Sequence, residues 1–193
     1  MTGAEEVLVG RHVDLRPLAA SDADLTFRWR NSARAGLLNQ GAGSVEQQAR
    51  WIEDRPQSER NYVIALKSGE AVGMLSLVDI DLHNSRAETG RFLIGEEERV
   101  KGVPAAVEAM ALLYDLAFNR LGLSRLYGTV AAANTLMIKW QKFLGMKEEG
   151  RLRHHYNIGG EFQDAVCLGI LKGEYEAEFL PKAKVLMTVA KTA

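Results

Sequence analysis

The sequence predicts a mixed α/β fold in which most strands are antiparallel. Short apolar runs separated by polar turns follow one another between residues 62 and 95, which is typical of an antiparallel meander. Apolar residues then recur at helical spacing over residues 104–120, which predicts a long helix. A β-α-β unit and a hairpin with Gly159-Gly160 at its turn follow. This order of elements indicates a single layered α/β architecture.

The N-terminal part is expected to form one strand and two helices. Residues 7–18 alternate between apolar and polar side chains well enough for a strand. Ser21 and Asp22 can cap the helix that follows. Ser44, followed three residues later by Gln47, fits a capping box and predicts a second helix.

The remaining elements are assigned from their apolar pattern and from Gly and Pro at their ends. We expect strands over 62–66, 71–80, 87–95, 126–130, 150–158 and 162–171, and helices over 104–120 and 135–144. The tail from Glu174 is expected to add a helix that Pro181 breaks, because a proline inside a helix removes a hydrogen bond and clashes with the preceding turn. Both an oligomer contact and simple surface packing remain open for this tail.

Composition excludes several classes of protein. The chain has 193 residues, with 24 Lys and Arg against 25 Asp and Glu, so no basic surface for nucleic acid is expected. No apolar run approaches the roughly 20 residues of a membrane span, and the N-terminus lacks the pattern of a signal peptide. One cysteine, Cys167, cannot form an intrachain disulfide. We therefore expect a cytoplasmic protein with neither nucleic acid nor membrane as a partner, and, without paired ligands at metal-site spacing, no metal.

The segment FLIGEEERVKGVPAA, residues 92–106, is the most informative part of the chain. An apolar strand runs into a polar loop containing Gly102 and then directly into the strongest helix. The first turn of such a helix leaves backbone N–H groups unpaired along a favourable dipole, which suits a pyrophosphate. An ordinary strand–helix connection is the alternative. The segment has neither the GxGxxG fingerprint nor a P-loop.

When the residues after this segment are added, the sequence resembles the GNAT family of acyl-CoA-dependent N-acetyltransferases. The resemblance rests on RVKGVP at 99–104, NTLMIKWQKFLGM at 134–146 and GEFQDAVCLGIL at 160–171, and covers roughly residues 15–172. It is strongest to the branch with ribosomal-protein, spermidine and nucleotide-amino-sugar acetyltransferases. It implies a GNAT-like, mostly antiparallel central sheet with helices on both faces. Residues 1–193 would form one such domain, with 173–193 as a C-terminal extension.

The resemblance also implies acetyl-CoA as the acyl donor. The family splays two strands, here 87–95 and 126–130, to admit the thioester. The residues that would bind the cofactor are Phe92, Leu93 and Ile94 on the strand, Arg99, Val100, Lys101, Gly102, Val103, Pro104 and Ala105 in the loop, and Asn134.

Two departures from the family pattern concern the chemistry. Pro104 has no N–H, so the loop offers one donor fewer to the phosphates. The family's usual tyrosine, the general acid to the leaving thiolate, falls on Gln141. A glutamine can donate a hydrogen bond but cannot release a proton at useful pH. Either the thiolate leaves without a side-chain acid or another residue supplies the proton.

A general base is needed because an alkyl amine has a pKa of about 10. The resemblance places Glu88 beside the thioester, and a structural role for this carboxylate remains the alternative. His154 and His155 are adjacent in a strand, so at most one can face the cleft. His155 is the candidate, against a surface or packing role.

The acceptor side is predicted from Trp29, Arg30 and Asn31, which resemble an element of the nucleotide-linked amino-sugar acetyltransferases. Arg30 could meet a diphosphate or a carboxylate while Trp29 stacks on the acceptor. The alternative is a solvated helical face with Trp29 in the core.

The first hypothesis is therefore acetyl transfer from acetyl-CoA to a small-molecule primary amine, an amino sugar on a nucleotide, by direct attack. A protein N-terminus or a polyamine is the alternative acceptor. A non-catalytic acyl-CoA-binding protein is the alternative class, and a homodimer is a possible assembly.

Overall fold

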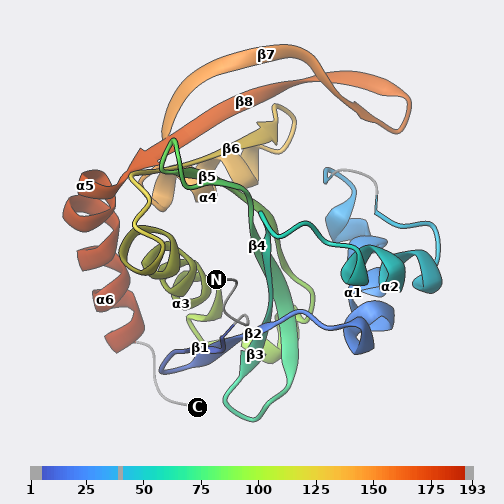
Figure 1. Ribbon diagram of the computed structural model, residues 1–193, viewed down its shortest axis with the longest axis horizontal. Coiled ribbons are helices and arrows are strands. Elements are labelled where there is room, and N and C mark those ends of the chain that lie inside the picture. The colour runs from blue at the N-terminus through green and yellow to red at the C-terminus, as the bar shows by residue number, and fades with distance from the viewer. Residues whose placement is uncertain (1–5, 39–40, 190–193) are drawn as a thin grey trace.

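Eight strands form one open sheet in the order β1-β2-β3-β4-β5-β6-β8-β7 (Figure 1). The computed structural model describes residues 6–38 and 41–189. Every neighbouring pair is antiparallel except β5 and β6. The strands are β1 (Leu8–Val9), β2 (Val13–Pro17), β3 (Arg60–Leu66), β4 (Ala71–Asp81), β5 (Arg86–Ile94), β6 (Arg125–Ala131), β7 (Lys147–Ile158) and β8 (Glu161–Leu171).

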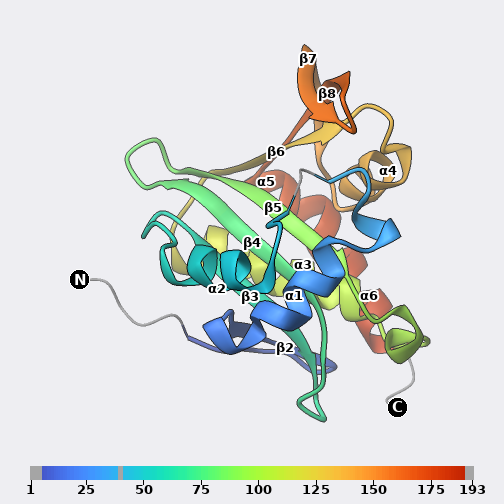
Figure 2. The same cartoon turned by 90° about the vertical axis from the view of Figure 1, so that its right-hand side faces the viewer.

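Helices cover both faces of this sheet, which confirms the predicted fold class (Figures 1 and 2). On one face lie α1 (Ala23–Arg30) and α2 (Val45–Glu53). On the other lie α3 (Ala105–Asp115) and the C-terminal helices α5 (Lys172–Glu174) and α6 (Leu180–Val189). Between β6 and β7 the chain forms α4 (Thr135–Phe143). The largest apolar core lies between the sheet and α3.

The first predicted strand is wrong in one respect, because the chain turns within it and makes two strands. The break is held by Glu108 of α3, whose carboxylate is buried. It accepts backbone hydrogen bonds from Arg11 at 2.8 Å, His12 at 2.6 Å and Val13 at 2.7 Å. The N–H groups that a continuous strand would use for pairing are therefore satisfied by a side chain 95 to 97 residues away.

The C-terminal prediction also needs correction, since Pro181 does not break the helix. Residues Tyr175–Phe179 form a wide π-type turn, in which the N–H of Leu180 reaches back to the carbonyl of Tyr175. The proline follows immediately and lies in the first turn of α6. A proline is tolerated there because its missing N–H falls where the regular hydrogen-bond ladder is already interrupted.

The C-terminal extension belongs to the core. Tyr175 and Phe179 are buried and make edge-on ring contacts with Tyr114 of α3, at centroid distances of 5.8 Å and 5.6 Å. Phe118, one turn beyond α3, stacks on Tyr175 at 5.1 Å. Of the two roles left open for this tail, the structure shows packing against its own domain.

The one parallel contact is short. β5 and β6 pair only at Arg86 with Arg125, Ala87 with Leu126, and Glu88 with Tyr127. Beyond this point the two strands separate, which confirms the expected splay. The sheet is thereby divided into a half containing β1 to β5 and a half containing β6 to β8.

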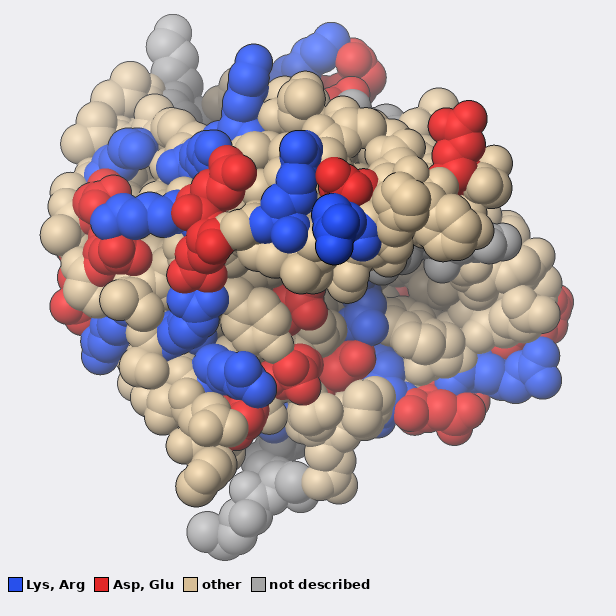
Figure 3. All heavy atoms as spheres, turned by 90° about the horizontal axis from the view of Figure 1, so that it is seen from above, with Lys and Arg blue, Asp and Glu red and all other residues tan. Residues whose placement is uncertain are grey.

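The surface charges are mixed. Acidic and basic side chains are interspersed over the face seen in Figure 3. Within residues 6–38 and 41–189, no helix is both long and apolar enough to cross a bilayer.

Candidate active site

A cleft of about 540 Å³ opens where β5 and β6 separate. Its walls come from α1, α2 and the connection between them, from β4, β5 and β6, and from α4 and β7. The β7–β8 hairpin extends from the sheet over this side of the molecule, toward α1 and α2 (Figure 1). Segments distant in sequence thus meet around one cavity.

Three polar side chains in the cleft form a hydrogen-bonded chain. The hydroxyl of Thr129 on β6 donates to the Glu88 carboxylate at 3.5 Å. The same hydroxyl is hydrogen-bonded to the Tyr156 hydroxyl of β7 at 2.6 Å, where either oxygen can be the donor. The Tyr156 hydroxyl also donates to the Thr129 carbonyl at 3.2 Å. All three residues line the cleft, so a carboxylate and a phenol are linked through one hydroxyl.

The surroundings of this chain favour the protonated forms of both ends. Burial raises the pKa of Glu88 above its ordinary value, and the nearby Asp79 carboxylate adds to the shift. Burial raises the pKa of Tyr156 as well, and the Glu88 charge acts in the same direction. A carboxylate with a raised pKa is a better proton acceptor at neutral pH, and the phenol keeps its proton available for donation.

Gln141 is buried in the cleft wall, with 6% of its surface exposed. Its side-chain oxygen accepts no hydrogen bond from any described residue. An unpaired buried acceptor is costly unless a donor reaches it. This oxygen is therefore suited to a ligand N–H, which is a different role from that of the acid expected at this position.

The edge of β5 that faces the gap fits the arm of an acyl-CoA. Met74 pairs with Leu93 and Gly73 with Ile94 on the β4 side, while pairing with β6 ends at Glu88. The opposite edge of this part of β5 can therefore bind an extended ligand as an added strand would. Phe92 lines the cleft and stacks on Trp140 of α4 at 5.8 Å, which joins the two walls.

The loop before α3 is built partly as expected for a pyrophosphate. Gly102 has a φ of +79° and open space where a side chain would begin, so a ligand can approach its backbone closely. Two backbone positions in this loop cannot donate a hydrogen bond to a phosphate. The Val103 N–H already donates to the Val100 carbonyl at 3.0 Å. Pro104, which precedes the first residue of α3, has no N–H. The unpaired N–H groups at the start of α3, from Ala105 onward, are the ones left to hold phosphates.

The charged side chains of this loop are exposed and engaged in ion pairs. Lys101 contacts Glu98 at 2.6 Å, and Arg99 contacts Glu70 at 3.2 Å. Exposed pairs of this kind contribute little stability and exchange readily for a ligand phosphate. The loop therefore fits coenzyme A with backbone donors as its main contacts.

Asn134 lines the cleft and begins α4, where its side-chain oxygen accepts the Met137 N–H at 3.1 Å. Its position at the rim of the cleft agrees with a contact to the cofactor arm, although capping the helix occupies its oxygen.

Three of the predicted catalytic and acceptor-binding residues do not line the cleft, and neither do Leu93, Ile94 and residues 99–105 of the predicted cofactor site. His155 is exposed and contacts the ring of Tyr156 edge-on at 4.7 Å, so Tyr156 is the one that enters the cleft. Trp29 is buried, and its indole N–H donates to Glu96 at 2.9 Å. Asn31 is exposed and donates to the Phe27 carbonyl at 2.9 Å. Of the proposed acceptor-binding trio, only Arg30 lines the cleft.

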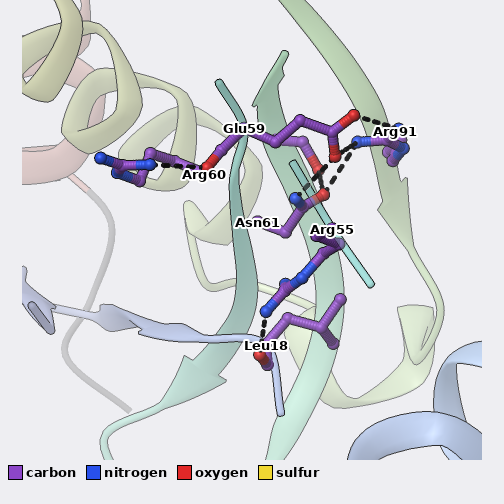
Figure 4. Close-up of polar contacts among 7 residues, drawn as sticks. Leu18, Arg55, Glu59, Arg60, Asn61 and Arg91 are labelled. Carbon is purple, nitrogen blue, oxygen red and sulfur yellow. Dashed lines mark hydrogen bonds and ion pairs between the residues drawn. The ribbon is translucent and has the colours of Figure 1, made fainter. Parts of the chain in front are cut away.

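Sequence reasoning missed an ordered cluster around Arg91, made of Arg55, Glu59, Asn61 and Arg91 (Figure 4). The Arg91 guanidinium donates to both Glu59 oxygens, at 2.7 and 3.1 Å, and to the Asn61 side-chain oxygen at 2.9 Å. It also lies over the ring of Trp51 at 4.9 Å. Arg91 and Trp51 both line the cleft. These residues come from α2, β3, β5 and the loop before β3, so no local pattern joins them.

The comparisons with known proteins agree with this geometry. The family model for an acetyltransferase (GNAT) domain matches residues 12–147. Spermidine N(1)-acetyltransferase of Escherichia coli is 34% identical over 131 residues, which cover 68% of each chain. The putative ribosomal N-acetyltransferase YdaF of Bacillus subtilis is 33% identical over 113 residues, 58% of this chain and 60% of that one.

Solved structures show the same fold. A GCN5-related N-acetyltransferase from Brucella melitensis superposes with a TM-score of 0.80 over 96% of this chain and 86% of the other, at 23% identity. A putative acetyltransferase from T. thermophilus gives 0.76 over 97% and 98%, at 27% identity. The chain therefore belongs to the GNAT acetyltransferase family and is an acyl-CoA-dependent N-acetyltransferase.

Proposed function

We propose that this enzyme transfers an acetyl group from acetyl-CoA to the primary amine of a small molecule, with Glu88 and Tyr156 moving the protons. The observation that carries this assignment is the chain Glu88–Thr129–Tyr156 in the cleft between β5 and β6. When bound, acetyl-CoA supplies an activated thioester carbonyl. The edge of β5 and the start of α3 hold its arm and its phosphates.

Glu88 is proposed to accept the proton that the neutral amine loses from its nitrogen as it attacks the thioester. Its raised pKa brings it closer to the pKa of the amine and so favours this transfer. Tyr156 is proposed to give its hydroxyl proton to the departing sulfur, which replaces the acid missing at Gln141. Thr129 lies between them and can pass the proton from Glu88 back to Tyr156. The proton removed from nitrogen is thereby balanced by the proton given to the thiol, and Glu88, Thr129 and Tyr156 return to their starting protonation states.

The proposed class of acceptor differs from the first choice of the sequence hypothesis. The comparisons give no support to a nucleotide-linked amino sugar, whereas spermidine is the acceptor named for several relatives. A small amine is thus the proposed acceptor, and a polyamine is a better candidate by similarity than a nucleotide sugar.

Thiol release tests this function against the non-catalytic alternative. We expect coenzyme A to bind in calorimetry and free thiol to appear from acetyl-CoA only when an amine is added. Mass spectrometry of the amine should show one acetyl group per thiol released. Binding of coenzyme A without amine-dependent thiol release would exclude the enzyme and leave an acyl-CoA-binding protein.

A further inference from the structure

Two of the three charged side chains among the described residues that line the cleft are guanidinium groups. Among the described residues that line it, the charged ones are Arg30, Glu88 and Arg91. The connection between α1 and α2, residues 31–44, has the sequence NSARAGLLNQGAGS and contains no Asp or Glu. Among the described lining residues, Glu88 thus supplies the one carboxylate, and this is the proposed base.

The Arg91 side chain is held rigidly in the cleft. Glu59 and Asn61 fix its guanidinium from one side, and Trp51 lies against its face. Asn61 is itself fixed, because its oxygen also accepts the Ser76 hydroxyl at 2.6 Å. A guanidinium has more N–H donors than these two partners use. Arg91 is therefore a preorganised donor group in the cleft wall.

Further guanidinium groups lie near Arg91. Arg30 and Arg91 line the same cleft; burial lowers the pKa of Arg30, and the Arg91 charge acts in the same direction. Arg55 adds a third guanidinium, and one of its buried nitrogens has no partner among the described residues. The described carboxylates near these groups are Glu59, which pairs with Arg91, and Glu88, on which the Asp79 charge also acts.

From this arrangement we propose that the acceptor is a primary amine that also carries an anionic group, a carboxylate or a phosphate, bound by Arg30 and Arg91 while the amine lies at Glu88. Arginine forks match both anions, and a partly desolvated site strengthens the interaction. The inference rests on the proposed acetyl transfer and adds the class of acceptor.

The same charges disfavour a polycation. A second ammonium group of a polyamine would lie among guanidinium groups, and like charges at short range in a desolvated cleft repel. This enzyme is therefore expected to differ in acceptor from the relatives that are named for spermidine.

A set of four-carbon amines tests which charge the site prefers at the end of the acceptor opposite the reacting amine. Butylamine has a methyl group there, 4-aminobutyrate a carboxylate and 1,4-diaminobutane a second ammonium; phosphoethanolamine tests a phosphate, and spermidine the longer polycation. We expect kcat/KM for at least one anionic amine to exceed that for butylamine by about tenfold or more, the range of a charge-assisted hydrogen bond. Diaminobutane and spermidine should fall below butylamine.

Variants of two arginines on α1 then test the role of Arg30. Arg30→Gln should bring the ratio of kcat/KM between the preferred anionic amine and butylamine toward one, and Arg30→Lys should restore part of it. Arg28→Gln is the matched control, because Arg28 is exposed on α1 and pairs with Asp24 outside the cleft. The affinity for coenzyme A, measured by calorimetry, should be unchanged in Arg30→Gln.

The outcomes separate the two proposals. If butylamine or a polyamine is the best substrate, the anionic acceptor is refuted and acetyl transfer stands. The anionic acceptor is also refuted if Arg30→Gln weakens coenzyme A tenfold and leaves the acceptor ratio intact, since Arg30 would then serve the cofactor. If no amine releases thiol, the proposed function fails and this inference fails with it.

Discussion

At the scale of single residues, the proposed chemistry depends on where two acidic groups are placed. Glu88 and Tyr156 lie on strands from opposite halves of the sheet, and Thr129 connects them at 3.5 Å and 2.6 Å. A glutamate and a tyrosine are common side chains, and their environment is what suits them to catalysis. Burial in a shared cleft raises the pKa of each, and this makes one a useful base and the other a stable proton donor.

Replacing Glu88 with Gln should lower kcat/KM about 100-fold or more, the usual share of a general base. In the unchanged enzyme the rate should rise with pH through a pKa above the ordinary glutamate value, because only the carboxylate accepts a proton. This limb should vanish in the variant. Glu53→Gln, on the exposed surface of α2, is the control for a lost charge. A uniform decrease at every pH would assign Glu88 to structure.

The same raised pKa has a consequence for stability. A carboxyl group whose pKa is higher in the folded state binds its proton more tightly there. Its contribution to stability is therefore full below the unfolded value and is lost as pH rises through the folded value. The Gln variant does not titrate, so it should gain stability relative to the unchanged enzyme as pH rises from 4 to 7 in urea unfolding.

Tyr156→Phe removes only the hydroxyl that contacts Thr129. We expect kcat to fall about 100-fold, within the range for a general acid, and coenzyme A affinity to stay the same. His155→Gln shows which of the two adjacent residues, His155 or Tyr156, takes part in catalysis, because His155 is the histidine that the sequence favoured. A loss of rate in His155→Gln together with a normal rate in Tyr156→Phe would return the role to the histidine.

At the scale of elements, buried side chains decide where strands and helices meet. Glu108 of α3 satisfies three backbone N–H groups where β1 turns into β2. On the other face, Gly95 allows the Trp29 indole to pack against the end of β5, since a Cβ there would lie 2.3 Å from the ring. This contact places the C-terminal end of α1, and with it Arg30, beside the cleft.

Replacing Glu108 with Gln should lower the free energy of unfolding by about 2 kcal/mol or more, because an amide offers one acceptor oxygen and leaves buried N–H groups unpaired. Urea unfolding measures the change. Glu46→Gln, near the exposed start of α2, is the control and should change stability by only about 0.5 kcal/mol or less. Equal stability of Glu108→Gln and the unchanged protein would contradict the role assigned to this carboxylate.

Most elements could be predicted because their signals are local. The meander, the capped start of α2 at Ser44 and the Gly159-Gly160 turn each depend on residues within a few positions of one another. The break between β1 and β2 could not be predicted, since its cause lies in α3. The tail helix was misjudged because the effect of Pro181 depends on the turn before it.

At the scale of the whole molecule, the short contact between β5 and β6 creates the site. Three residue pairs join two halves of the sheet, and the separation beyond them provides the cleft. The low net charge of the chain is compatible with an anionic cofactor, because backbone N–H groups rather than a basic surface are the proposed phosphate donors. The homodimer stays a prediction.

The sequence by itself determined the family and most of the order of the elements, because both are encoded in contiguous motifs with fixed spacing. The cofactor loop at residues 99–105 stays a prediction of the same kind. The sequence also placed Glu88 as the candidate base and showed that the usual tyrosine is absent. Only the tertiary structure brought Tyr156 to the cleft in place of His155, buried Trp29, and assembled the cluster around Arg91. Those features depend on which face of a strand each residue occupies and on contacts between distant segments, and a local pattern encodes neither.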